Sequence, residues 1–148
     1  MTTKQELEFA LRNAMKSGDE VSKRTIRMVL ASIKLVEVEK GSSLSEPELA
    51  AILQKEIKLR KEAIQDAEKG NRPDLVEANQ AEIKVLETFL PQQLTEDELT
   101  AIAKAVINQV GANSPADMGK VMKMLLPQIK GQAPNELVSK IVRQLLNG

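Results

Sequence analysis

The 148-residue chain contains no cysteine and no histidine. Without cysteine, the chain cannot form disulfide bonds, supply a thiolate nucleophile or build a thiolate metal site. Without histidine, it lacks the commonest metal ligand and the usual general base near neutral pH. Neither a P-loop nor a nucleophile-elbow spacing is present. The sequence therefore offers no catalytic residue, no metal site and no cofactor site that we can identify.

The chain is also poor in aromatic residues, of which it has only Phe9 and Phe89. Single-stranded nucleic acids stack on several aromatic faces, so this mode of binding is disfavoured. No apolar run reaches the roughly 18 residues of a membrane span. The polar segment 1–8 lacks the apolar core of a signal peptide. These absences lead us to expect a cytoplasmic protein with no membrane partner.

The chain also has no net charge, because 21 basic side chains balance 21 acidic ones. A neutral chain carries no global field that would indicate a nucleic acid or an acidic membrane as its partner. Apolar residues nevertheless make up 42% of the chain. That fraction is enough for a hydrophobic core and too high for a disordered protein.

What the sequence does contain is helical spacing of apolar residues, without the alternation of a strand. The clearest stripe predicts a helix that begins after Asp19 and ends near Gly41, with a core face formed by Ile26, Val29, Leu30, Ile33 and Val36. Capping-box spacings predict three further helix starts, at Thr3 with Glu6, Ser45 with Glu48, and Thr95 with Glu98. We therefore predict an all-α protein.

The helical pattern breaks at residues 91–94. Leu90 precedes Pro91 and is pushed towards an extended backbone, and the two glutamines that follow continue no stripe. The break predicts a hinge between two domains. A multihelical N-terminal domain of long helical hairpins spans residues 1–90, and a small three-helix bundle spans residues 95–148. In the bundle, we expect the middle helix to begin with a cap at Ser114 and to end at Pro127.

The C-terminal domain holds a local excess of positive charge. Residues 111–148 contain five basic side chains against two acidic ones, a net charge of +3. We expect Lys120 and Lys123 to point outwards from one helix, and Lys130 to lie in a loop whose backbone N–H groups also suit a phosphate. With Lys140 and Arg143 they form the candidate nucleic-acid-binding set. The alternative is an ordinary solvated helix face.

Other charged groups have a structural explanation. The acidic pairs Glu37/Glu39 and Glu62/Asp66 are interpreted as solvated helix faces, because neither a histidine nor a pocket signature accompanies them. A second basic cluster consists of Lys55, Lys58, Arg60 and Lys61. Its acidic neighbours lie at the spacing of helical ion pairs, such as Lys58 with Glu62, so we interpret the cluster as ion-paired.

The methionines of the C-terminal domain allow two interpretations, an adaptable binding surface or a core. Met118 and Met122 follow the apolar stripe of their helix, so we expect them in the core. Met124 lies off that stripe and is expected to be exposed.

Three segments, in order along the chain, resemble sequence motifs of the YqeY family. Residues 24–34 resemble its N-terminal R-x-LRMLLAAIK stretch, and residues 82–94 resemble its EI-x-VLE-x-(Y/F)LP-x-QL junction. Residues 117–122 and 130–131 resemble its DMGKVM…KG(R/K)AD segment. The joint occurrence of these motifs makes the resemblance specific, and it covers nearly the whole chain.

The resemblance implies a C-terminal domain similar to the tail domain of the B subunit of tRNA-dependent amidotransferases. In those enzymes the tail helps to hold the tRNA, while the amide-donor chemistry lies in other domains and subunits. The resemblance thus links the chain to carbon–nitrogen ligase systems with glutamine as amide donor. It implies Lys120, Lys123 and Lys130 as tRNA-backbone contacts. Gln132 and Pro134 depart from the family pattern, where a basic residue and Asp-Gly are common.

Three functional hypotheses remain open. The leading one is a tRNA-binding or amidotransferase-associated accessory protein without an active site of its own. The alternative is a protein–protein interaction adaptor with no nucleic-acid role. A free-standing amide-forming enzyme is the third, and it requires a nucleophile or a metal site that the sequence does not show.

Overall fold

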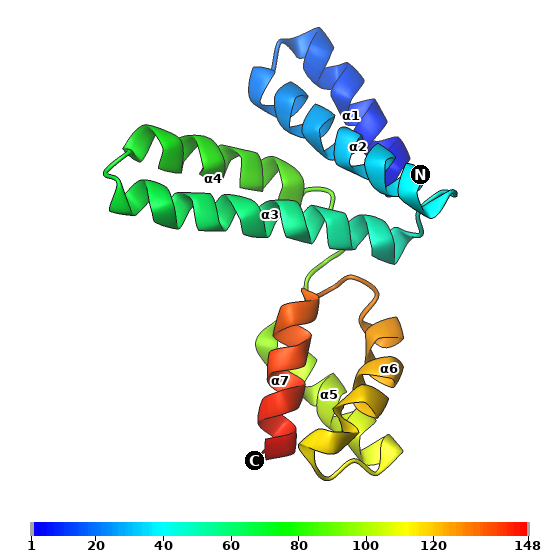
Figure 1. Ribbon diagram of the computed structural model, residues 1–148. Helices are drawn as coiled ribbons and strands as arrows, with labels where there is room; N and C mark the ends of the chain where they lie inside the picture. The colour runs from blue at the N-terminus through cyan, green and yellow to red at the C-terminus, as the bar shows by residue number, and fades with distance from the viewer. Residues whose placement is uncertain (1, 148) are drawn as a thin grey trace. The chain divides into compact units, whose positions relative to one another are not determined.

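The computed structural model describes residues 2–147, and Figure 1 shows them as helices joined by short loops. No strand occurs in this range, which confirms the predicted all-α fold. The helices are α1 (Thr3–Ser17), α2 (Glu20–Lys40), α3 (Glu46–Lys69), α4 (Pro73–Glu87), α5 (Glu96–Val110), α6 (Met118–Ile129) and α7 (Asn135–Asn147). A short 3-10 turn, η1 (Pro115–Asp117), precedes α6.

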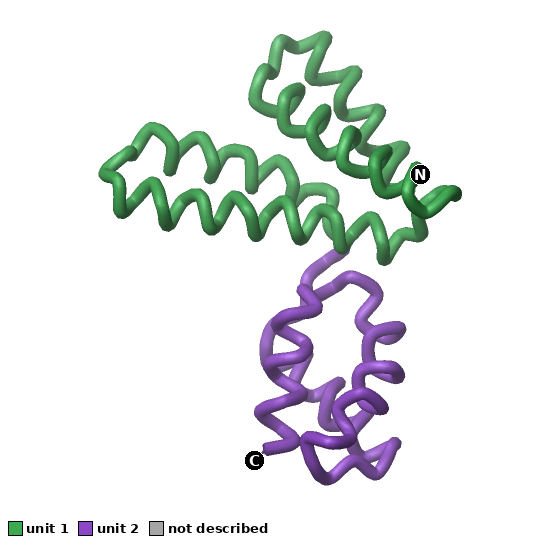
Figure 2. Tube along the Cα trace, viewed as in Figure 1, with its two compact units in different colours: residues 1–90 green, residues 91–148 purple. Residues whose placement is uncertain are grey.

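The chain forms two compact units, coloured separately in Figure 2. Unit 1 is residues 1–90 and holds α1 to α4, and unit 2 is residues 91–148 and holds α5 to α7. Residues 91–94 are attached to unit 2 by hydrogen bonds. The Leu94 N–H donates to the Gln132 carbonyl over 2.8 Å, and Gln93 Nε2 donates to the Gly131 carbonyl over 3.1 Å.

Unit 1 is built from two helical hairpins, α1 with α2 and α3 with α4 (Figure 1). Helix α2 also packs on α3 and α4, and so joins the two hairpins. The shared core consists of the fully or nearly fully buried side chains Leu7, Ile26, Val29, Ile33, Leu49, Leu53, Ile57, Ile83 and Leu86. Each side chain of this size contributes about 1.5–3 kcal/mol when it is removed from water.

The capping predictions for unit 1 are partly right. Ser45 and Glu48 form the predicted capping box of α3, and Asp19 caps α2 by accepting from the Ser22 N–H. The predicted box at Thr3 is wrong, because Thr2 caps α1 together with Gln5. The hydroxyl of Thr3 instead donates to Glu46 on α3. Thr2 with Gln5 is also a capping-box spacing, so the sequence offered two local caps, and the structure uses the first of them.

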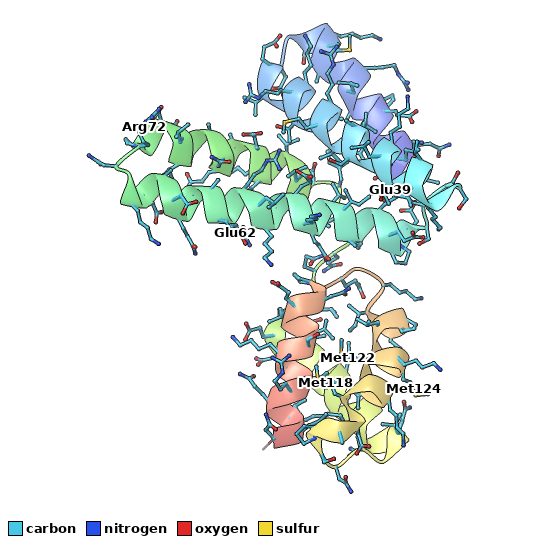
Figure 3. All side chains as sticks on the ribbon, viewed as in Figure 1. Glu39, Glu62, Arg72, Met118, Met122 and Met124 are labelled. Carbon is cyan, nitrogen blue, oxygen red and sulfur yellow. The ribbon has the colours of Figure 1, made fainter. Side chains whose placement is uncertain are left out.

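Unit 2 is a three-helix bundle around its own core. The buried apolar side chains come from all three helices and the last loop, and they are Leu99, Ala103, Val106, Val121, Leu125, Ile129, Ala133, Val138, Ile141, Val142 and Leu146. Met118 and Met122 pack against this core, as predicted, and Met124 is 47% exposed. Figure 3 labels all three on the segment of α6.

The predicted ends of the middle helix were wrong in two respects. Ser114 makes no capping bond, and the η1 turn intervenes before α6. Helix α6 also continues through Pro127 to Ile129. Proline inside a helix removes one backbone hydrogen bond and crowds the preceding turn, at a cost of about 3 kcal/mol, and burying Ile129 returns about 1.5–3 kcal/mol. Ile129 is 1% exposed, so its burial in the bundle offsets most of the cost of the proline.

Candidate functional site

Three of the predicted basic residues follow one face of α6. Lys120, Lys123 and Lys130 are exposed and spaced by three and seven residues, which returns to the same side of a helix. The opposite side carries the buried residues Val121, Leu125 and Ile129. Lys130 ends the helix in a left-handed conformation with φ 51°. Lys120 and Lys123 therefore face away from the core, and Lys130 is exposed at the end of the helix.

The two remaining basic residues lie on α7. Lys140 and Arg143 are exposed and three residues apart, so they share the outward face of that helix. Helices α6 and α7 pack against each other, which places both basic rows on neighbouring helices of one bundle. In the described range 2–147, none of the five residues forms an ion pair. Their charge is therefore not neutralised by the fold.

The loop after α6 does not offer the backbone donors that the sequence suggested. The Lys130 N–H donates to the Leu126 carbonyl, and the Gln132 N–H donates to the Ile129 carbonyl over 3.0 Å. Gly131 is also engaged in an interaction. The N–H groups of Lys130 and Gln132 thus complete the helix end, and neither is available to a phosphate.

The acidic pairs are not arranged as a metal or acid–base site. Glu37 lies 2.9 Å from the Lys4 ammonium on α1 and joins α1 to α2. Glu39, at the end of α2, and Glu62, on α3, are exposed (Figure 3). Across the residues with assigned positions, no group of three or more acidic side chains could hold a metal ion.

A buried charge cluster in unit 1 was missed by the sequence analysis. Arg60 is only 6% exposed. Its Nη1 donates to Glu56 Oε2 over 2.8 Å and to the Glu56 carbonyl over 3.0 Å, and its Nη2 reaches Glu82 Oε1 on α4 at 3.5 Å. On the α2 side, Ser32 Oγ donates to Glu56 Oε1 over 3.3 Å. One arginine therefore connects α3 with α4, and its partner Glu56 connects α3 with α2.

Two buried polar atoms of unit 1 are unsatisfied, and one of them belongs to this cluster. Arg60 Nε and Thr25 Oγ1 are buried and have no hydrogen-bond partner. The side chain of Met28 covers the arginine, with its sulfur 3.9 Å from Nη2. One signal for the cluster is visible in the sequence, the i, i+4 spacing of Glu56 and Arg60. It did not distinguish a solvated pair from a buried one, because burial depends on α2 and α4.

An open groove lies at the turn between α3 and α4, lined in part by Asn71, Arg72 and Val76. Arg72, labelled in Figure 3, donates to Asp74 through Nε over 3.1 Å and Nη2 over 3.0 Å. This pair lowers the pKa of Asp74 and raises that of Arg72. Two of the donor nitrogens of Arg72 are therefore engaged by a neighbour in sequence.

Comparison with known proteins identifies several fungal relatives, all named "Altered inheritance of mitochondria protein 41, mitochondrial". The relative from Lachancea thermotolerans is 33% identical over 113 residues, which are 74% of this chain and 60% of the relative. The Kluyveromyces lactis relative is 32% identical, with 93% of this chain and 79% of the relative covered. The Pyrenophora tritici-repentis relative is 29% identical, with 95% and 78% covered.

The expectation of a cytoplasmic protein is contradicted by these relatives, because their name places them in mitochondria. The expectation depended on the lack of cysteine and of a signal-peptide core. Neither property distinguishes the cytosol from another reducing aqueous compartment. Between residues 2 and 147, no helix is both long and apolar enough to span a membrane.

The family of this chain follows from a match to a known family that covers almost the entire sequence. The sequence pattern described as "Yqey-like protein" matches residues 4–146. This range includes both structural units and every residue of the basic rows and of the Arg60 cluster. The chain belongs to the YqeY family of Yqey-like proteins.

Proposed function

We propose that this protein binds the phosphate backbone of tRNA through the outward faces of α6 and α7, as an accessory to tRNA-dependent amide transfer. The observation that carries the proposal is the set of five exposed cations on these helices, Lys120, Lys123, Lys130, Lys140 and Arg143, none of which has an ion-pair partner in the described chain. Exposed cations on a rigid bundle attract phosphates and release the counterions condensed on them.

The choice of tRNA follows from the resemblance of unit 2 to the amidotransferase tail domain, which helps to hold tRNA. The electrostatic pattern of the chain agrees with this choice. Residues 1–94 carry 15 basic and 16 acidic side chains, and residues 111–148 carry a net charge of +3. The excess of positive charge is therefore concentrated on α6 and α7, and a folded duplex RNA presents the matching negative surface.

Salt dependence of tRNA binding by the full chain tests the proposal. Duplex contacts give a log–log slope of about −0.9 each, so five contacts predict a slope of about −4.5. A fourfold rise in salt concentration then weakens binding about 500-fold. The double variant Lys120→Glu/Lys123→Glu should lose two contacts, reduce the slope by about 1.8 and weaken binding at least about tenfold.

The matched control is Lys55→Glu/Lys61→Glu. Both residues are exposed on α3, and the variant changes the net charge by the same amount in the other unit. We expect it to bind tRNA within about twofold of the wild-type chain, because only local charges contact phosphates. Equal losses in both variants, or wild-type binding that does not depend on salt, would exclude the proposed surface.

The adaptor hypothesis predicts a different result. On that view, a protein partner co-purifies in stoichiometric amount after nuclease treatment, and the Lys120→Glu/Lys123→Glu variant retains it. Sequencing the RNA that co-purifies before nuclease treatment separates the two functions, since the tRNA proposal predicts enrichment of tRNA over other RNA.

A further inference from the structure

Helix α2 carries a second apolar stripe, opposite its buried face, that is largely exposed; within unit 1 the sulfur of its first residue, Met28, lies 3.9 Å from Arg60 Nη2 on α3. The stripe consists of Met28, Ala31, Leu35 and Val38, spaced by three, four and three residues. Met28 is 49% exposed, Leu35 is 67% exposed and Val38 is 72% exposed. A helix in a monomeric unit normally has one apolar face and one polar face. Two apolar faces on α2 indicate that the second one is used in an interaction.

Unpaired charges of opposite sign lie at the two ends of the stripe. Arg24 and Arg27 are exposed near its beginning, and Glu39 is exposed at its end, where Figure 3 labels it. None of the three forms an ion pair within residues 2–147. A surface with a positive end, an apolar centre and a negative end is complementary to a reversed copy of itself.

We propose that a second copy of this chain packs its α2 antiparallel against this stripe and forms a weak, two-fold symmetric dimer. A two-fold interface uses the same patch on both subunits, so each residue must find its partner within that patch. This requirement fixes the register. With the axis between residues 31 and 32, Met28 lies at the height of the partner's Leu35, and Arg24 lies at the height of the partner's Glu39.

Two independent pairs share this one axis. Arg24 and Glu39 are 15 residues apart, about 22 Å along a helix, and Met28 and Leu35 are seven residues apart, about 10 Å. Both pairs have the same midpoint, so a single antiparallel register joins opposite charges and packs apolar against apolar. Ala31 lies next to the axis, where its small side chain permits close approach of the two helices.

An anionic membrane fits the stripe less well. Glu39 would face the lipid phosphates, and the stripe has no aromatic residue to anchor it at the interface. The apolar stripe is also narrow. Four side chains from each subunit bury less than a standard interface, which predicts a reversible dimer with a dissociation constant of about 10 µM to 1 mM.

Sedimentation velocity of the full chain, from about 1 µM to about 1 mM, tests the proposal over the range of weak association. We expect a concentration-dependent shift from monomer to dimer. Leu35→Lys should raise the dissociation constant at least about tenfold, because it places two charges in the apolar centre. The control Leu75→Lys changes another exposed leucine of unit 1, which lies on α4 and is 42% exposed, and should leave association unchanged.

Charge reversal tests the register. Arg24→Glu and Glu39→Arg should each weaken the dimer about fivefold, because two-fold symmetry repeats the pair. The double variant Arg24→Glu/Glu39→Arg should return to within about twofold of wild type. A monomer at every concentration, association that survives Leu35→Lys, or a double variant that is not restored would each overturn the proposal. Circular dichroism of each variant verifies that its helices are intact.

Discussion

Replacing Arg60 with methionine tests the buried charge cluster. Methionine retains the apolar stem and removes the charge and the five donors of the guanidinium group. Glu56 and Glu82, whose side chains are 15% and 14% exposed, would then face each other without the arginine between them. Because the substitution leaves little empty volume, a loss of stability would report on the electrostatics of the cluster and not on a cavity.

The structure gives the expected magnitude. At an effective dielectric constant of 20, the 2.8 Å contact to Glu56 has a Coulomb energy of about 6 kcal/mol, and the 3.5 Å contact to Glu82 about 5 kcal/mol. Desolvation of Arg60 and of both carboxylates offsets most of this attraction. Removing one member of a buried ion pair therefore typically costs about 3–5 kcal/mol. For a unit of about 90 residues, this loss lowers the melting temperature by roughly 12–40 °C.

Differential scanning calorimetry of the full-length Arg60→Met variant measures this loss. The variant should lower the melting transition of unit 1 and leave that of unit 2 in place, because the cluster lies within residues 1–90. Lys61→Met is the matched control, since Lys61 is the exposed neighbour of Arg60 on α3. We expect the control to stay within about 0.5 kcal/mol of the wild-type chain.

A loss below about 1 kcal/mol would refute the reasoning, because a buried cluster cannot lose its cation so cheaply. It would mean that water reaches the two carboxylates in solution. Equal destabilisation by Lys61→Met would also refute the reasoning. The loss of stability would then come from introducing methionine into α3 and not from the charge cluster.

Two further predictions concern unit 1. Hydrogen bonds from Lys40 and Ser45 lower the pKa of Glu48 from 4.5 to about 2, so its stabilisation is present above pH 4.5 and is lost as the pH falls towards 2. Glu48→Gln can still form the capping box. In thermal scans it should have a lower melting temperature than the wild type at pH 6, and this difference in melting temperature should vanish near pH 2. A difference that does not change with pH would contradict the stabilising role of the Glu48 charge. Thr25→Val removes a buried hydroxyl that has no partner, so it should stabilise unit 1 by about 1 kcal/mol in calorimetry, and a destabilised variant would show that the hydroxyl is bonded.

Local sequence signals predicted most of the fold. The boxes at Ser45 and Thr95, the cap at Asp19 and the end of α2 at Gly41 depend on hydrogen bonds within four residues, and all are present in the structure. There are two exceptions. The cap of α1 is Thr2, the other local candidate, and α6 passes Pro127, where the burial of Ile129 in the bundle offsets most of the cost of the proline.

The candidate site was predicted only in part from the sequence. The outward direction of Lys120 and Lys123 follows from helical spacing, and the structure shows both exposed. Spacing did not reveal that the N–H groups of Lys130 and Gln132 are occupied, because their acceptors belong to the closing turn of α6. Spacing placed Ile26, Val29 and Ile33 correctly in the core, but Val36 of the same predicted face is 37% exposed, and the exposed apolar residues around Leu35 were not predicted.

By itself, the sequence excluded any chemistry that needs a cysteine or a histidine of this chain. It also determined the helical class, the boundaries of most helices and the surplus of positive charge on α6 and α7. These properties depend on composition and on contacts between near neighbours along the chain. Only the tertiary structure decided that Arg60 is buried between two carboxylates while Lys61, its neighbour, is solvated. The physical reason is that burial, and with it the energy of a charge, is set by helices that are distant in sequence and meet only in the folded unit.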